Sequence, residues 1–156
     1  MFFGSENLEI FFQLFLAAVL GAFLGVEREL ARKTAGLRTY ALVSMGSALF
    51  SIISTIAFKE FIGSTSFDPS RIASQVVVGI GFIGAGLIVF HNSRIQGLTT
   101  AAGLWVAAAI GMAVGYKFYA IAVFTAFLTI FIFVAFWIIE YYLKKWSIAS
   151  SDYDGV

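Results

Sequence analysis

Charged and hydroxyl side chains gather where the first long apolar run of the chain ends and the second begins. Glu27 and Arg28 close the first run, and Arg38 and Thr39 open the second across a short turn. Because a charge at the edge of an apolar phase is tolerated best when it is paired, these charges could meet as ion pairs in a functional polar cluster. The alternative is that the basic residues of the turn only fix its side of a membrane and touch anionic lipid.

A second polar group leads into the third apolar run. Arg71, Gln75 and Gly79 are four residues apart, so one helix face would carry a charge, an amide and a gap in line. A solute path could begin this way, or Gln75 could simply hydrogen-bond a neighbouring helix. Asp68 can cap the free amides of a helix that starts at Pro69. With two threonines of the fourth run, the candidate functional polar cluster comprises Glu27, Arg28, Arg38, Thr39, Asp68, Arg71, Gln75, Thr99 and Thr100.

The residue types that most catalytic and metal sites need are scarce. The chain has no cysteine and one histidine, His91, which excludes disulfides, a cysteine nucleophile and multi-histidine metal sites. The apolar runs hold no carboxylate near their middle, so a deep magnesium site is not supported. We therefore expect no catalytic residue, no cofactor and no bound metal. A net charge of +1 also excludes a basic field for nucleic acid.

The elements that must position these residues follow from the composition. Of 156 residues, 60% are hydrophobic and 12% charged, against about 25% charged in a soluble domain. Lipid is therefore the expected solvent, and a helix that spans it needs about 20 apolar residues. The apolar runs do not alternate as barrel strands would. We predict an all-α membrane domain over residues 1–156, with five transmembrane helices at about 8–26, 40–58, 72–90, 98–116 and 118–139 and a short cytoplasmic tail at 140–156.

The short loops decide the predicted orientation. The N-terminus lacks the positive stretch of a signal peptide, so we expect the first helix to be retained. Basic residues favour the cytoplasmic side, which predicts the N-terminus outside and the C-terminus inside. That orientation leaves Lys59, Arg71 and Lys117 outside, and places inside Arg28, Arg32, Lys33, Arg38, Arg94, Lys144 and Lys145.

Small residues four apart mark the faces on which helices approach closely in lipid. A literal G-x-G-x-x-G at residues 79–84 lies inside an apolar run with no strand before it, so it indicates packing or bending rather than dinucleotide binding. The fifth helix has no glycine, and we expect it to be peripheral and to face lipid. The predicted helix-packing residues are Gly21, Gly25, Gly79, Gly84, Gly103, Gly111 and Gly115.

Four stretches together resemble the MgtC/SapB family of bacterial membrane proteins. They are LGVERE (Leu24 to Glu29), AGLRTYALVSMGSALF (Ala35 to Phe50), DPSRIASQVVVGIGFIGAG (Asp68 to Gly86) and GLTTAAGLWVAAAIG (Gly97 to Gly111). The resemblance covers about residues 8–116. It implies five helices in the bacterial inner membrane, and a link to growth in low magnesium and to survival inside macrophages. One branch of the family has been proposed to inhibit the F-type ATP synthase.

The chain looks closer to the short, SapB-like members, since the virulence-linked branch usually carries a cytoplasmic C-terminal domain that we do not expect here. Two functions remain open. The first is a non-enzymatic regulator or stress-adaptation factor of the inner membrane, whose partners are the lipid bilayer and another membrane protein or a second copy of itself. The second is a small oligomeric transporter or channel for an ion or small solute. No nucleic-acid partner is expected.

Overall fold

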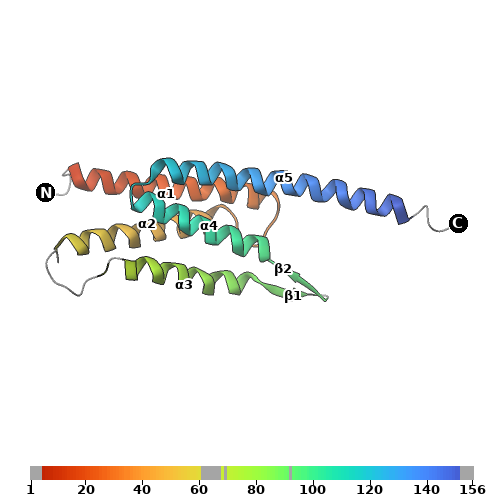
Figure 1. The fold of residues 1–156 in the computed structure, drawn as a ribbon, viewed down its shortest axis with the longest axis horizontal. Helices are drawn as coiled ribbons and strands as arrows, with labels where there is room; N and C mark the ends of the chain where they lie inside the picture. The colour runs from red at the N-terminus through yellow and green to blue at the C-terminus, as the bar shows by residue number, and fades with distance from the viewer. Residues whose placement is uncertain (1–4, 61–67, 69, 92, 152–156) are drawn as a thin grey trace.

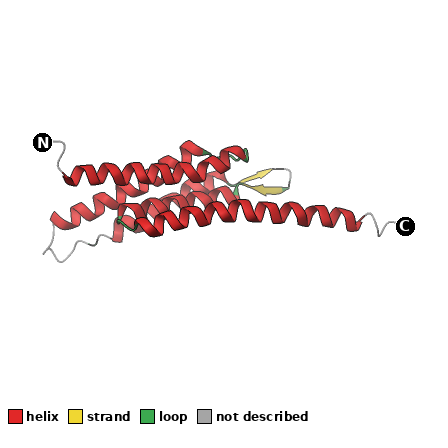
Figure 2. Cartoon of the chain, turned by 90° about the horizontal axis from the view of Figure 1, so that it is seen from above, coloured by secondary structure: helices red, strands yellow, loops and turns green. Residues whose placement is uncertain are grey.

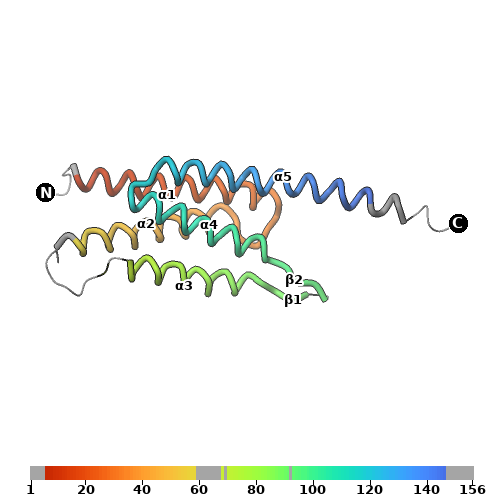
Figure 3. Tube along the Cα trace, in the orientation of Figure 1, coloured from red at the N-terminus to blue at the C-terminus, as the bar shows by residue number. Residues whose placement is uncertain are grey.

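Helices make up almost all of the described chain. The computed structural model describes residues 5–60, 68, 70–91 and 93–151. The helices are α1 (Ser5–Leu30), α2 (Leu37–Glu60), α3 (Ser70–Leu87), α4 (Leu98–Gly115) and α5 (Tyr119–Ser151), and the strands are β1 (Val89–His91) and β2 (Arg94–Gln96). Successive helices run in opposite directions along an elongated bundle (Figure 1), which the view from above and the Cα trace show equally (Figures 2 and 3).

All five helices are long and apolar enough to cross a bilayer. The qualifying segments are Glu6–Leu30, Leu37–Phe58, Ser70–Leu87, Leu98–Gly115 and Tyr119–Trp146. At about 1.5 Å per residue, even 18 residues approach the thickness of the hydrocarbon core, which is about 30 Å. The predicted all-α fold with five membrane-spanning helices is confirmed.

A small β-hairpin stands where the third helix was expected to continue to residue 90. Helix α3 ends at Leu87, and β1 then pairs antiparallel with β2, with Phe90 opposite Ile95. The chain enters α4 through Gly97, which has a φ of +89°. A Cβ added at this position would lie 2.9 Å from the carbonyl carbon of Leu87. An apolar composition alone did not separate a strand pair from the last turn of a helix, because short apolar runs occur in both.

The fifth helix is longer than the sequence predicted. We expected it to stop near residue 139 and a tail to follow, but α5 continues to Ser151. The first charges after the apolar run form an ion pair within the helix, with Lys144 Nζ 2.5 Å from Glu140 Oε1 one turn away. Here the charged residues mark the end of the apolar run of the sequence, and the helix continues beyond them.

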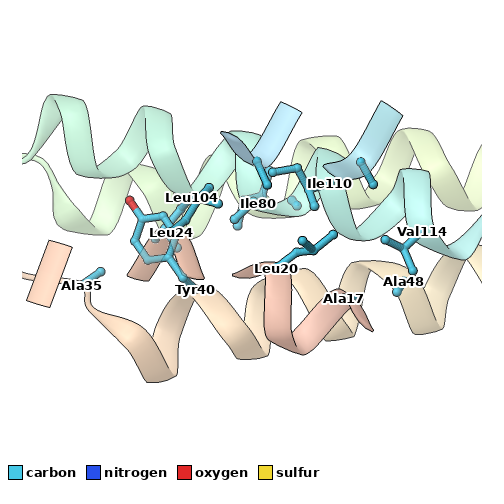
Figure 4. Close-up of a cluster of buried hydrophobic side chains, with 14 residues drawn as sticks. Ala17, Leu20, Leu24, Ala35, Tyr40, Ala48, Ile80, Leu104, Ile110 and Val114 are labelled. Atoms are coloured by element: carbon cyan, nitrogen blue, oxygen red, sulfur yellow. The ribbon is translucent and has the colours of Figure 1, made fainter. Parts of the chain in front are cut away.

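Helix α4 lies at the centre of the bundle and contacts each of the other four helices. Half of its span is buried, more than in any other of the five spans. Its apolar side chains meet those of α1 and α2 in a core whose largest buried members include Tyr40, Leu24, Leu104 and Ile110. Figure 4 shows these side chains gathered between α1, α2 and α4.

Glycines allow the backbones of the central helices to touch. A Cβ built at Gly111 would overlap the backbone of Ser44 on α2, 2.7 Å from its carbonyl carbon, and one at Gly115 would lie 2.7 Å from the carbonyl oxygen of Ala48. A Cβ at Gly21 of α1 would overlap the backbone of Tyr40, and a Cβ at Gly25 would overlap the backbone at the start of α2.

The glycines of α3 differ from those of α1 and α4. A Cβ at Gly84 would make an ordinary contact, 3.6 Å from the Cβ of Ala101. A Cβ at Gly79 would have no atom within 4 Å, so this glycine does not lie in a helix contact of the described chain. Spacing along one helix cannot tell which of its faces a neighbour covers.

The least buried helix is α3, although we expected this of the glycine-free α5. Only 11% of the α3 span is buried, compared with 22% of the α5 span. The bulky side chains of α5 do face outward, among them Phe124, Phe127 and Phe131. However, α5 also packs along both α1 and α4, because small residues such as Ala122 and Ala126 form its inner face.

Candidate functional site at the basic end of the bundle

One end of the bundle collects most of the basic side chains. The end of α1, the 31–36 turn, the start of α2, the hairpin and the last part of α5 all lie at this end (Figure 1). They carry Arg28, Arg32, Lys33, Arg38, Arg94, Lys144 and Lys145. We call this the basic end.

Arg28 is the most deeply placed charge of the basic end. Its side chain is only 4% exposed, and its Nε–H donates to a carboxylate oxygen of the neighbouring Glu27, with which it forms an ion pair. The guanidinium carbon lies 3.7 Å from the centre of the Phe133 ring of α5. A buried guanidinium is stabilised here both by a carboxylate and by the face of an aromatic ring.

Arg38 does not join this cluster, contrary to the expected pairing across the turn. Its side chain is exposed, and within the described residues it forms no ion pair. The carboxylate that reaches α2 is Glu29 Oε2, which accepts a hydrogen bond from the backbone N–H of Leu37 at 3.3 Å. Because α2 already begins at Leu37, Arg38 lies in its first turn. Thr39 follows it, half-buried.

A pocket of about 790 Å³ opens beside Arg28, between α1, α4 and α5. Polar groups line its α1 side and aromatic side chains its α5 side. The lining residues are Glu27, Arg28, Leu30, Ala31, Arg32 and Lys33 from α1 and its turn, Thr99, Ala102, Gly103 and Val106 from α4, and Thr129, Ile132, Phe133, Val134, Phe136, Trp137 and Glu140 from α5. We call this the Arg28 pocket.

The packing of Tyr40 against α4 fixes one wall of this pocket. The Tyr40 hydroxyl donates to the backbone carbonyl of Thr100 at 3.1 Å, and the whole side chain is buried. Gly103 lies under it, and a Cβ at this position would also come within 2.7 Å of Phe133. Thr100 is buried beside this contact, whereas Thr99 is exposed and faces the pocket.

The remaining predicted site residues lie at the opposite end of the bundle. Asp68 Oδ1 accepts hydrogen bonds from the backbone N–H of Ser70 at 2.9 Å and from its hydroxyl at 2.7 Å. These bonds from Ser70, helped by nearby Arg71, lower the pKa of the Asp68 carboxyl below its ordinary value. Asp68 therefore caps α3 in the way expected of it, while Pro69 lies outside the described residues.

A groove of about 830 Å³ follows the first three turns of α3. It lies between α2 and α3 and contains Arg71, Gln75 and Gly79, the three residues predicted to share a face. The Arg71 side chain is 80% exposed, with its Nε 4.0 Å from Asp68 Oδ2. The nine polar candidates thus form two separate groups, one at each end, and not a single cluster.

Sequence reasoning missed the most enclosed polar side chain of α1. Gln13 is 2% exposed, and its Nε2 donates to the carbonyl oxygens of Val114 at 2.9 Å and of Gly115 at 3.1 Å. It therefore supplies a donor to the carbonyl oxygen of Gly115 and a second donor, beside the backbone N–H of Lys117, to that of Val114 at the C-terminus of α4. An amide within an apolar run is a signal that could have identified it, because a lipid-facing amide would be costly.

An ion pair between distant segments was missed as well. Lys117 Nζ, in the turn between α4 and α5, lies 2.7 Å from Glu9 Oε1 in the first turns of α1. The hydrogen bond to Glu9 raises the pKa of Lys117 above its ordinary value. Nothing in the local sequence around either residue pointed to the other.

Comparison with known proteins places the chain among bacterial relatives. YhiD of Escherichia coli, whose name gives magnesium transport as its proposed role, is 49% identical over 118 residues, or 74% of this chain and 55% of YhiD. Protein MgtC of Salmonella typhimurium is 48% identical over 102 residues, or 65% of this chain and 41% of MgtC. An uncharacterised Haemophilus influenzae protein is 42% identical over 125 residues, or 78% of this chain and 52% of that protein.

The chain spans about half the length of these curated relatives. No solved structure matches it. The model of the MgtC family matches residues 14–142, which include all five spans in whole or in large part. The family match and the identity to YhiD confirm the resemblance seen in the sequence, and this multi-pass membrane protein belongs to the MgtC family.

Proposed function

We propose that this chain is a non-enzymatic regulatory protein of the bacterial inner membrane that acts through helix contacts with other membrane proteins. The observation that supports this proposal most is the filled interior of the bundle. Tyr40, Leu24, Leu104, Ile110 and Val114 are almost completely buried along the central helix contacts. A path for a hydrated ion through one copy would have to displace these side chains, which pack at the density of a protein interior.

The chemistry of the described residues also favours a binding role. The single histidine, His91, is exposed on β1 and is not among the residues that line the Arg28 pocket. Residues 5–60, 68, 70–91 and 93–151 contain no group of three or more His, Asp or Glu side chains that could hold a metal ion. Magnesium binding by protein ligands would need several oxygen donors in such a group.

The partner surface that we propose is the outer face of α3. The glycines of α1 and α4 are used inside the bundle, where a larger residue would disturb the fold itself. By contrast, Gly79, Gly81 and Gly86 of α3 have no neighbour within 4 Å of a built Cβ. Close helix approach of a partner would use such positions, since small residues drive helix association in lipid.

We also propose that the basic end faces the cytoplasm. Most short-loop Lys and Arg residues lie at this end, and such residues are retained on the cytoplasmic side. The N-terminus would then be outside and the C-terminus inside. Labelling of single cysteines introduced at Ser93 and Lys117, in intact cells and in lysed cells, tests the orientation. Labelling of the Ser93 site in intact cells would contradict it.

Photo-crosslinking in native membranes tests the regulatory role. A photoreactive residue replaces Val78, which is exposed on α3, and a matched control replaces Phe131, which is equally exposed on α5. We expect a discrete crosslinked protein from the α3 position alone. Absence of a crosslink from α3, or the same products from both positions, would contradict the proposed partner surface.

The α2/α3 groove supports the second candidate, a small oligomeric transporter. Arg71 and Gln75 both line it, and apart from Ser47 its remaining lining is apolar. Purified protein in liposomes that contain a magnesium-sensitive or pH-sensitive dye distinguishes the two functions. A regulator gives no flux above that of protein-free liposomes. Flux that is lost in Arg71→Ala and Gln75→Leu variants would overturn the regulatory proposal and assign the groove as a solute path.

A further inference from the structure

The Arg28 pocket combines positive charge with an apolar wall. Five titratable side chains line it, namely Glu27, Arg28, Arg32, Lys33 and Glu140. Glu27 is paired with Arg28, and Glu140 with Lys144. In the described part of the chain neither Arg32 nor Lys33 forms an ion pair, so the mouth of the pocket keeps an excess positive charge.

Arg28 has hydrogen-bonding capacity left on the pocket side. Of its five N–H donors, only Nε–H donates to another described residue, the carboxylate of Glu27. The guanidinium is held in one orientation by that carboxylate and by the Phe133 ring, 3.7 Å from its central carbon. A fixed guanidinium fork with free terminal N–H groups matches the geometry of a phosphate group.

The opposite wall of the pocket is apolar and reaches the lipid-facing side of α5. Phe136 and Trp137 line it and are 60% and 63% exposed. These positions lie near the end of the apolar run, just before Glu140, and so at the depth of the headgroups and upper acyl chains. A small soluble anion would leave this wall uncovered, whereas an acyl chain would cover it.

We propose that the Arg28 pocket binds an anionic phospholipid, with the headgroup phosphate at Arg28, Arg32 and Lys33 and an acyl chain along Phe136 and Trp137. The bound phospholipid would belong to the membrane leaflet on the side of the basic end. This site is independent of whether the protein regulates a partner or transports a solute, because it uses neither α3 nor the α2/α3 groove.

Fluorescence quenching by brominated lipids tests the site on the full chain. Trp105 and Trp146 are replaced by Phe, so that Trp137 is the one remaining tryptophan. The protein is placed in phosphatidylcholine bilayers that contain a minor fraction of either brominated phosphatidylglycerol or brominated phosphatidylcholine. We expect stronger quenching of Trp137 by the anionic lipid at equal mole fraction. Equal quenching by the two lipids would overturn the proposal.

Two charge variants separate the pocket from the general surface charge. Arg32→Gln with Lys33→Gln removes two exposed charges at the mouth, and Arg94→Gln with Lys145→Gln removes two exposed charges of the same end outside the pocket. The first pair should weaken the preference for the anionic lipid roughly tenfold more than the second. Equal losses in both would assign the preference to the surface as a whole and overturn the pocket.

A third arm distinguishes a lipid from a free anion. Inorganic phosphate and glycerol phosphate are added to the brominated phosphatidylglycerol sample at concentrations well above that of the lipid sites. The lipid site predicts that quenching persists, because neither compound can replace the acyl-chain contact. Relief of quenching by either compound would overturn the lipid assignment in favour of a small-anion site. Helical circular dichroism of each variant verifies that the bundle remains folded.

Discussion

The hydroxyl of Tyr40 occupies the space that a Cβ at Gly103 would need, and this contact joins α2 to α4 next to the Arg28 pocket, which Gly103 lines. The hydroxyl also donates to the carbonyl oxygen of Thr100, one turn before Gly103. The side chain of Tyr40 is completely buried, so it cannot move aside without losing this hydrogen bond. A side chain of any size at position 103 therefore competes with Tyr40 for the same space.

Gly103→Ala should destabilise the bundle by about 1–3 kcal/mol, the usual cost of overpacking a core. The matched control is Gly79→Ala on α3, where a Cβ meets nothing within 4 Å. That change should stabilise its helix by about 0.5–1 kcal/mol, because alanine loses less backbone entropy than glycine. Apparent melting temperatures in detergent, at one scan rate, measure both. A higher melting temperature for Gly103→Ala would contradict the contact with Tyr40.

Gln13→Leu should destabilise the protein by about 1–3 kcal/mol. The change removes the side-chain donor to the carbonyl oxygen of Gly115 and one of the two donors to that of Val114, at a buried contact. Gln75→Leu is the control, since Gln75 is an exposed amide at the edge of the α2/α3 groove. Chemical unfolding followed by circular dichroism compares the two. The prediction fails if the Gln75 variant loses as much stability as the Gln13 variant.

Arg28→Met should cost about 3–5 kcal/mol, because it leaves the part-buried Glu27 carboxylate without its cation. It also removes the guanidinium from the face of Phe133. Adding Glu27→Gln to Arg28→Met should recover much of this loss, since no buried charge then remains. Equilibrium unfolding of the single and double variants forms the test. If the double variant is less stable than Arg28→Met, the two side chains do not act as a pair.

The pair between Lys117 and Glu9 should make stability depend on alkaline pH. Because the pKa of Lys117 is raised in the folded protein, its contribution is fully present below the unfolded pKa of about 10.4. It is lost as the pH rises through the higher folded value. The melting temperature of the wild type should therefore approach that of Lys117→Met above this range. A constant difference between the two proteins across the range would refute the linkage.

The residue types and their order determined the membrane fold. Five apolar runs are long enough to span a bilayer and do not alternate as barrel strands would. They predict helices, because lipid offers the backbone no hydrogen-bonding partner. The runs of α1, α2 and α4 were therefore identified closely, and so was the capping of α3 by Asp68. Gly103 and Gly111 were identified from spacing alone, since close helix approach requires positions without a side chain.

Only the tertiary structure decided which helix faces meet and therefore which residues share a site. It brought Arg28 into contact with Phe133, which lies 105 positions later in the chain. It also brought Gln13 to the end of α4. The same packing placed Arg71 and Gln75 in a groove between α2 and α3 and left Gly79 without a neighbour within 4 Å of a Cβ. The periodicity of a helix fixes which residues share a face, but the partner of that face depends on the packing of all five helices together.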